Sequence, residues 1–140
     1  TIKKMGRVFF NTRKNIHALD AAYTVLDSDS GKVFMLSSTG GAYSITLPTA
    51  PVEGFFCKFI VDENTPTGDI TIDAGSAIID FVMKDPGGNA SNSTAGTQKQ
   101  YIVLHTECTK GDYVNLLSDG TSYYGEAMSA IDDAIDHTAQ

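Results

Sequence analysis

Histidines and glycine-rich loops are the first features that would indicate chemistry in this chain. The three histidines, His17, His105 and His137, lie far apart, and no pair has the spacing of a zinc site on a helix. His105 follows an apolar stretch, so we expect it at the rim of a sheet rather than as a catalytic base. The sequence contains neither a phosphate-binding loop nor a nucleophile elbow. We therefore expect no enzyme activity, no cofactor and no metal.

Two cysteines, Cys57 and Cys108, each lie in an apolar stretch of the chain. A free thiol in such a stretch behaves as a small hydrophobic side chain. Nothing in their spacing argues for a disulfide, although a bridge stays possible. We expect buried free thiols, because chains that work in the cytoplasm are kept reduced.

The acidic stretch DSDSG, residues 27–31, begins like a calcium-binding loop. Such a loop requires a glycine at its sixth position and an acidic ligand at its twelfth, which here is Ser38. The match fails, and the stretch is expected to be a solvated turn.

Short apolar stretches separated by turn residues predict the elements that hold these side chains. Turn signals recur every eight to twelve residues, which is typical of an antiparallel β-sandwich or a jelly-roll-like barrel. The chain is therefore expected to be all-β. The expected strands cover residues 32–36, 42–47, 55–61, 69–73, 77–83, 101–106, 112–117 and 122–124.

Two turns and one continuous apolar stretch give more detailed expectations. Ser38-Thr-Gly-Gly between strands 32–36 and 42–47 favours a hairpin, because glycine adopts positive φ without strain. Asp119-Gly120 is a favoured two-residue hairpin turn. The stretch KVFML at 32–36 has no polar alternation, which is typical of a strand buried on both faces.

The two ends differ from this pattern and give a three-part organisation of the 140 residues. Residues 1–20 are predicted to be a basic N-terminal arm, with the first strand of the body as the alternative. Residues 21–126 form the β-domain. Residues 127–140 are expected to be a short helix or a frayed tail, because apolar residues from Met128 to Ile135 lie near one face of a helix.

Charge is unevenly distributed along the chain. The net charge is −7, yet five of the ten basic residues precede the first acidic residue, Asp20. The remaining five basic and seventeen acidic residues give the body a charge of −12. A basic arm on an acidic body suits an acidic protein surface and makes DNA an improbable main partner. No apolar stretch is long enough for a membrane span.

The central stretch resembles a β-module of structural proteins from tailed bacteriophages. That module has Gly-Lys before an apolar strand, Gly-Ala, a strand ending in Leu-Pro, and then Gly-aromatic-x-Phe-Ile-Val. The residues that match are Gly31, Lys32, Gly41, Leu47, Pro48, Gly54, Phe59, Ile60 and Val61. The stretch SDGTSYYGEA at 118–127 resembles its closing hairpin, with Tyr123 or Tyr124 where the module often has tryptophan. The resemblance covers residues 29–125.

The resemblance implies a non-enzymatic virion protein, and two placements are open. The first is a capsid decoration (cement) protein, assembled in the host cytoplasm, that binds the major capsid protein on the head exterior. The second is a tail-fibre, tailspike or receptor-binding domain. A single domain without a detectable repeat, starting at Thr1 as after removal of an initiator methionine, favours the first.

A decoration protein needs a contact surface for the capsid and an oligomeric state. A cyclic trimer is our expectation, because closed symmetry is the norm. A carbohydrate-binding module with exposed tyrosines is an alternative from a different class. The expected capsid contacts all lie in the arm: Lys3, Lys4, Arg7, Phe9, Phe10, Arg13 and Lys14.

Overall fold

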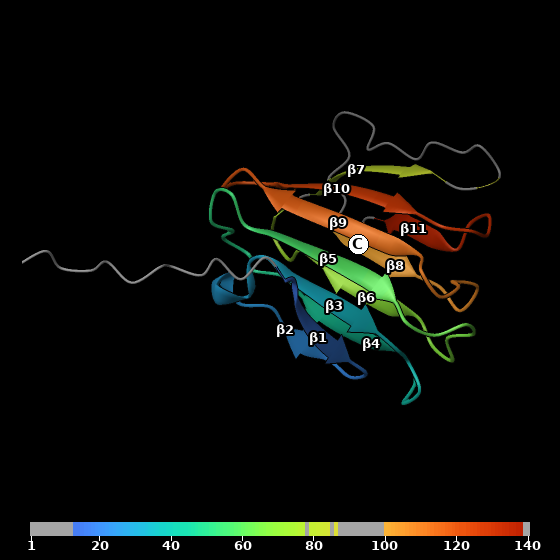
Figure 1. The fold of residues 1–140 in the computed structure, drawn as a ribbon. Coiled ribbons are helices and arrows are strands. Elements are labelled where there is room, and N and C mark those ends of the chain that lie inside the picture. Colours follow the sequence, from blue (N-terminus) through green and yellow to red (C-terminus); the bar gives the residue numbers. More distant parts are fainter. Residues whose placement is uncertain (1–12, 78, 85, 87–99, 139–140) are drawn as a thin grey trace, which may run out of the picture.

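Two β-sheets pack face to face in this protein (Figure 1). The computed structural model describes residues 13–77, 79–84, 86 and 100–138. The six-stranded sheet has the order β1 (Asn15–Leu19), β3 (Lys32–Leu36), β5 (Phe56–Val61), β9 (Tyr113–Ser118), β10 (Tyr123–Met128) and β7 (Ile79–Lys84). The five-stranded sheet has the order β11 (Ile135–Thr138), β8 (Tyr101–Leu104), β6 (Ile70–Asp73), β4 (Tyr43–Thr46) and β2 (Tyr23–Thr24). The all-β sandwich expected from the sequence is confirmed.

The core lies between the sheets and follows from the strand alternation. Phe34 and Phe59, on neighbouring strands β3 and β5, are fully buried, and their rings stack with centroids 5.1 Å apart. Ile45, Ile72 and Ile102 form the matching row across the five-stranded sheet. The alternation therefore assigns each strand an inner and an outer face.

The expected C-terminal helix is wrong. Residues 123–128 form β10 in the six-stranded sheet, and residues 135–138 form β11 at the edge of the five-stranded sheet. In β11, Ile135 and His137 face the core and are buried, as the period of a strand requires. A helix of this length would be marginal alone, whereas a strand gains a complete ladder from β8. Among the described residues, no helix has the length and apolar character needed to span a membrane.

Strand pairing is mixed rather than purely antiparallel. Strands β1, β3 and β5 run parallel to one another, as do β2, β4 and β6, and β7 runs parallel to β10. From β1 to β6 the chain alternates between the two sheets, so each return to a sheet has the same direction. This half is a stack of three coils, and antiparallel pairs begin where β8 and β9 join it.

The hairpin expected at 32–47 is also wrong, because its two strands lie in different sheets. Strand β3 belongs to the six-stranded sheet and β4 to the five-stranded sheet. The turn between them is therefore an arch, in which the chain passes from one sheet to the other at the edge of the core. A hairpin does join β9 and β10, with Tyr123 opposite Ser118, but not through the two-residue turn expected at Asp119-Gly120. Its connection has four residues, closed by the Asp119 N–H donating to the Ser122 carbonyl at 3.2 Å.

Ser38 joins two successive arches where the coils stack. Its side chain is buried, its backbone N–H donates to Glu63 Oε2 at 2.7 Å, and its Oγ accepts the N–H groups of Thr67 and Gly68. A Cβ at Gly68 would lie 2.2 Å from the Ala42 nitrogen, so only glycine permits this approach of the two arches.

Asp29, in the 3₁₀ turn Asp27–Asp29, is a second buried polar centre. It accepts hydrogen bonds from the Leu26 N–H, the Tyr23 hydroxyl and the Lys32 ammonium. Burial alone would raise the pKa of Asp29, but these three donors outweigh burial and hold the pKa below its ordinary value. The stretch expected to be a solvated turn therefore carries a structural carboxylate.

The boundary of the predicted arm also moves. Asn15–Leu19 is strand β1, paired in parallel with β3, so the end of the predicted 1–20 arm belongs to the sheet. The part of the arm before Arg13 lies outside the described residues.

Candidate interaction surface

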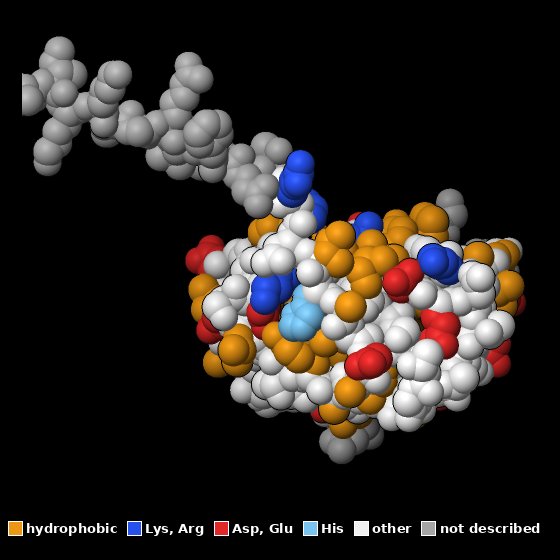
Figure 2. Space-filling model, turned by 60° about the horizontal axis from the view of Figure 1, so that its bottom comes forward, with side chains coloured by type: hydrophobic (Ala, Val, Ile, Leu, Met, Phe, Trp, Pro, Cys, Tyr) orange, Lys and Arg blue, Asp and Glu red, His pale blue; other side chains and the backbone are white. Residues whose placement is uncertain are grey.

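The outer face of the six-stranded sheet exposes large apolar side chains. Phe56, Leu117 and Tyr124 lie opposite one another on β5, β9 and β10, and their exposed fractions are 46%, 51% and 49%. Folded monomers seldom expose a contiguous group of this kind without a use for it. Figure 2 shows hydrophobic side chains gathered beside lysine and acidic side chains on the surface.

Strand register arranges this surface in three rows across β5, β9 and β10. The first and third rows are mainly apolar, and the middle row carries both charges. We call these nine outward residues the six-strand face: Phe56, Leu117 and Tyr124; Lys58, Asn115 and Glu126; Ile60, Tyr113 and Met128.

A shallow hollow of about 490 Å³ lies over the first and middle rows. Val33 and Phe56 line its apolar side, and Lys14 reaches it from the residue before β1, with Nζ 5.7 Å from the centre of the Phe56 ring. A cation above an aromatic face is an attractive arrangement. The hollow therefore connects the described end of the predicted arm to the sheet surface.

Polar groups of the middle row are fixed in place. Asn115 Nδ2 donates to Glu126 Oε1 at 2.8 Å, and Lys58 Nζ lies 4.3 Å from the centre of the Tyr113 ring. Lys58 and Glu126 flank Asn115 on either side, so the sheet separates them by two strand spacings, about 10 Å. They present one positive and one negative position to a partner.

The stretch KVFML forms β3, which lies next to β5 in the same sheet. A continuous apolar strand is typically covered on both faces, but Val33 and Met35 of β3 lie on the outer face and are only partly buried. Because both side chains keep part of their surface exposed, this face of β3 is less completely covered than the inner face, where Phe34 and Leu36 are buried.

The outer face of the five-stranded sheet is polar by contrast. Its outward residues are mainly threonine, serine and aspartate. We call these the five-strand face: Thr24, Ser44, Thr46, Thr71, Asp73, Tyr101, Val103, Asp136 and Thr138.

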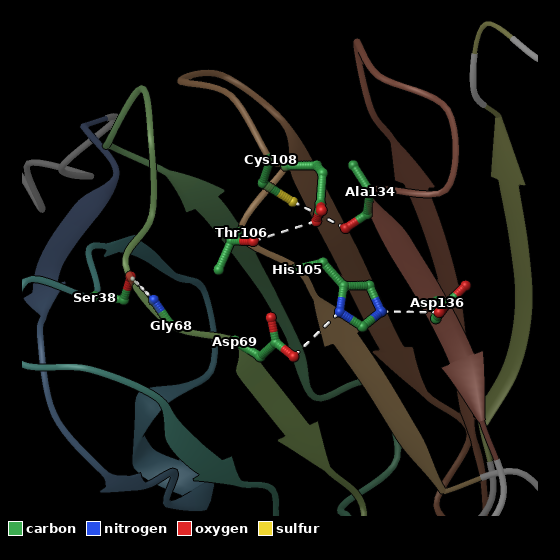
Figure 3. A network of polar contacts seen from close by, with 9 residues as sticks. Ser38, Gly68, Asp69, His105, Thr106, Cys108, Ala134 and Asp136 are labelled. Atoms are coloured by element: carbon green, nitrogen blue, oxygen red, sulfur yellow. Dashed lines mark hydrogen bonds and ion pairs between the residues drawn. The ribbon is translucent and has the colours of Figure 1, made fainter.

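His105 holds one end of the five-strand face together, just after β8 (Figure 3). Its Nδ1 lies 3.2 Å from Asp69 Oδ2, and its Nε2 lies 2.8 Å from Asp136 Oδ2. Each ring nitrogen faces a carboxylate, and only the doubly protonated ring donates to both. Burial alone would lower the pKa of His105, but the bonds to Asp136 and Asp69 raise it above its ordinary value.

The hydrogen-bonding groups of this histidine all have partners in the described residues. Both nitrogens are occupied by carboxylates, and its backbone N–H donates to Ala134 at 2.9 Å. The contacts connect the start of β6, the end of β8 and strand β11. The sequence expectation of a satisfied rim histidine is confirmed.

The thiols of the two cysteines lie in the interior. Cys57 and Cys108 are buried and free, which confirms the expectation. Burial raises the pKa of both thiols to about 12, so they are not nucleophiles at neutral pH. His17 packs against Tyr23 and Phe34. Within the described ranges, no group of three or more His, Cys, Asp or Glu residues is placed to hold a metal ion.

The predicted contact residues are placed only in part. Lys3, Lys4, Arg7, Phe9 and Phe10 lie outside the described residues. Arg13 and Lys14 are exposed immediately before β1, and Lys14 lies on the hollow of the six-strand face. The carbohydrate-binding alternative requires exposed tyrosines: Tyr124 is exposed, whereas Tyr123 is buried and donates its hydroxyl to the Pro48 carbonyl at 2.7 Å.

Comparison with known proteins adds no relative. No protein-family model matches the chain, and no curated protein matches it.

Sequence reasoning missed the six-strand face itself. The signal was present in FFCKFIV and YYGEAM, where apolar residues occupy both alternating positions of a strand. Only the register between β5, β9 and β10 shows that the outward members form one surface.

Proposed function

We propose that this chain is a non-enzymatic structural protein of a tailed-phage virion, which binds the major capsid protein and stabilises the assembled head. The observation that carries the proposal is the position of Lys14. The described end of the basic segment lies against Phe56 at the rim of an exposed apolar face, so the basic segment joins the body on the side that presents this face. The resemblance of residues 29–125 to phage β-modules supplies the virion context.

The mechanism is thermodynamic linkage. A protein that binds assembled shell but not free subunits stabilises the shell by the free energy of its contacts. Many identical sites on one closed lattice then add together. The arm residues Lys3, Lys4, Arg7, Phe9, Phe10, Arg13 and Lys14 are the proposed capsid contacts, with Lys and Arg directed to acidic positions and Phe9 and Phe10 to apolar ones.

Copy number per particle is the direct test. Quantitative protein analysis of purified virions should find on the order of hundreds of copies, as a shell lattice requires. About a dozen copies would instead assign the chain to the tail, which is the alternative function as a receptor-binding domain.

Arm variants test the contact residues. Replacing Lys3, Lys4 and Arg7 together by serine should reduce occupancy on isolated heads in co-sedimentation by about tenfold or more, with the loss smaller at high salt. Lys110→Ser, which removes an exposed lysine paired with Asp62 at 3.3 Å, is the matched control. Unchanged occupancy of the triple variant would remove the arm from the proposal, and strong binding to a glycan array would favour the carbohydrate-binding alternative.

A further inference from the structure

We propose that the six-strand face binds the same face of a second copy, with a two-fold axis that runs parallel to β9 between the copies. The register of β5, β9 and β10 supports this self-association. Only its consequence for the arm rests on the proposed function.

The positions of Lys58 and Glu126 favour a second copy of the chain as the partner. An axis parallel to β9 places β5 of one copy over β10 of the other, so Lys58 of each copy faces Glu126 of the other. The two ion pairs form together, since the interface is self-complementary. A two-fold axis perpendicular to the strands would instead place each Lys58 over another Lys58, and like charges exclude that arrangement.

The apolar rows match under the same axis. Phe56 faces Tyr124 of the second copy, which suits an offset aromatic pair. Leu117 lies under the axis and faces its own counterpart. In the third row Ile60 faces Met128, whose flexible side chain fills irregular gaps. Every apolar position of the face thus meets an apolar position.

Two sheets that stack in this way form an ordinary packing arrangement. Aligned sheets pack about 10 Å apart and keep their mean strand directions within about 30° of each other, and an axis parallel to β9 satisfies this condition. The second sheet would cover Val33 and Met35, the outer residues of the continuous apolar strand β3, at the margin of the contact. The cover that KVFML predicts on its second face is then supplied by the partner copy.

The size of the face sets the expected strength. Nine positions on three strands span roughly 15 by 20 Å in projection, from the strand and residue spacings. The two faces together then cover about 600 Å² in projection, which is below the roughly 1,200 Å² at which standard specific interfaces begin, so the contact is a weak and transient one. We therefore expect a reversible pair with a dissociation constant of about 1 to 100 µM.

One geometric consequence connects pairing to attachment. A rotation about an axis parallel to the strands preserves their direction, so the two Lys14 residues lie at the same end of the pair. Both arms therefore begin at the same end of the pair, and a single capsid surface would be held by two arms with the gain of bivalent binding. A pair related by an axis perpendicular to the strands would direct the arms to opposite ends.

Sedimentation of the full chain across its micromolar range tests the pairing without any capsid, so its failure is separate from failure of the proposed function. The mass should rise to that of two chains. Leu117→Glu should keep the chain monomeric at concentrations where the original pairs, because two carboxylates meet on the axis. Thr71→Glu, on the central strand β6 of the five-strand face, is the matched control and should pair normally.

A charge-swap series keeps the proposal testable even if Leu117→Glu fails to fold. Lys58→Glu and Glu126→Lys should each weaken pairing about tenfold, and the double variant should restore it, because the ion pairs re-form with reversed sign. A single-chain mass at all concentrations, a trimer mass, or a double variant no better than the singles would overturn the proposal. In the first of these cases, loss of head binding by Leu117→Glu would assign the face to the capsid instead.

Discussion

The outer faces of the two sheets share the same strand alternation but carry opposite kinds of side chain. The six-strand face presents Phe56, Leu117 and Tyr124 to solvent, whereas the five-strand face presents Thr46, Thr71 and other polar residues. Both sheets bury equivalent inner rows, so the difference is not needed to form the core. This difference is the reason why we propose a partner for the six-strand face and none for the five-strand face.

We compare the two outer faces with the connections between the sheets. A substitution in these connections is expected to change the free energy of unfolding most. Ser38→Ala should lower the free energy of unfolding by about 2 kcal/mol, because the part-buried N–H groups of Thr67 and Gly68 both lose the Ser38 hydroxyl as their acceptor. Chemical denaturation measures the change. A loss below about 0.5 kcal/mol would show that the arches do not stack through this hydroxyl.

Asp29 gives the next largest effect. Asp29→Asn should cost about 1 to 2 kcal/mol at neutral pH, since the charge-assisted bond from Lys32 is lost while some acceptor capacity stays. The folded pKa of Asp29 lies below its unfolded value, so its contribution is present above the ordinary pKa of 3.8 and disappears as the pH falls through the folded value. The stability difference between the two proteins should therefore shrink in acid. A difference that stays constant down to the lowest pH at which both fold would contradict this account.

The five-strand face should show a smaller effect with the opposite pH direction. The folded pKa of His105 is raised, so its stabilisation is present below the ordinary pKa and is lost as the pH rises through the folded value. The contacts are partly exposed, which limits the expected contribution to about 0.5 to 1 kcal/mol. Denaturation at several pH values, with the double variant Asp69→Asn and Asp136→Asn as the comparison, measures it. The prediction is wrong if the original protein gains stability relative to the variant between weakly acid and weakly basic pH.

The six-strand face should show the smallest effect on stability. Leu117→Thr makes the centre of this face resemble the five-strand face and keeps a residue that favours strands. We expect a change within about 0.5 kcal/mol in the isolated chain, with a clear decrease in binding of a fluorescent hydrophobic dye. A large loss of stability would mean that Leu117 serves the fold rather than a partner.

Much of the fold follows from local patterns in the sequence. Alternation and turn residues place β3 to β9 and the start of β10, but not β1, β2 or β11, and the buried thiols at Cys57 and Cys108 follow from their apolar neighbours. Strand pairing was predicted wrongly at Ser38-Thr-Gly-Gly, because such a turn serves equally as a hairpin or as an arch between sheets. The difference depends on which distant strand lies alongside, and no local residue records that.

The stacked coils are not detectable as a repeat in the sequence. Each coil has an apolar strand end, a turn and a second apolar strand, as in Leu36 to Ile45 and Val61 to Ile72. The turns differ in length from coil to coil, so no fixed period connects them. The His105 contacts were equally inaccessible, because Asp69 and Asp136 approach it from distant parts of the chain.

The alternation of the chain between sheets also constrains the order of events during synthesis. The first three coils emerge from the ribosome with β5 and β6 as open edges, and these edges are sealed only when β9 and β8 have been made. Unsealed strand edges are templates for aggregation. Premature termination within the coils should therefore yield insoluble product, and slower translation should not rescue it.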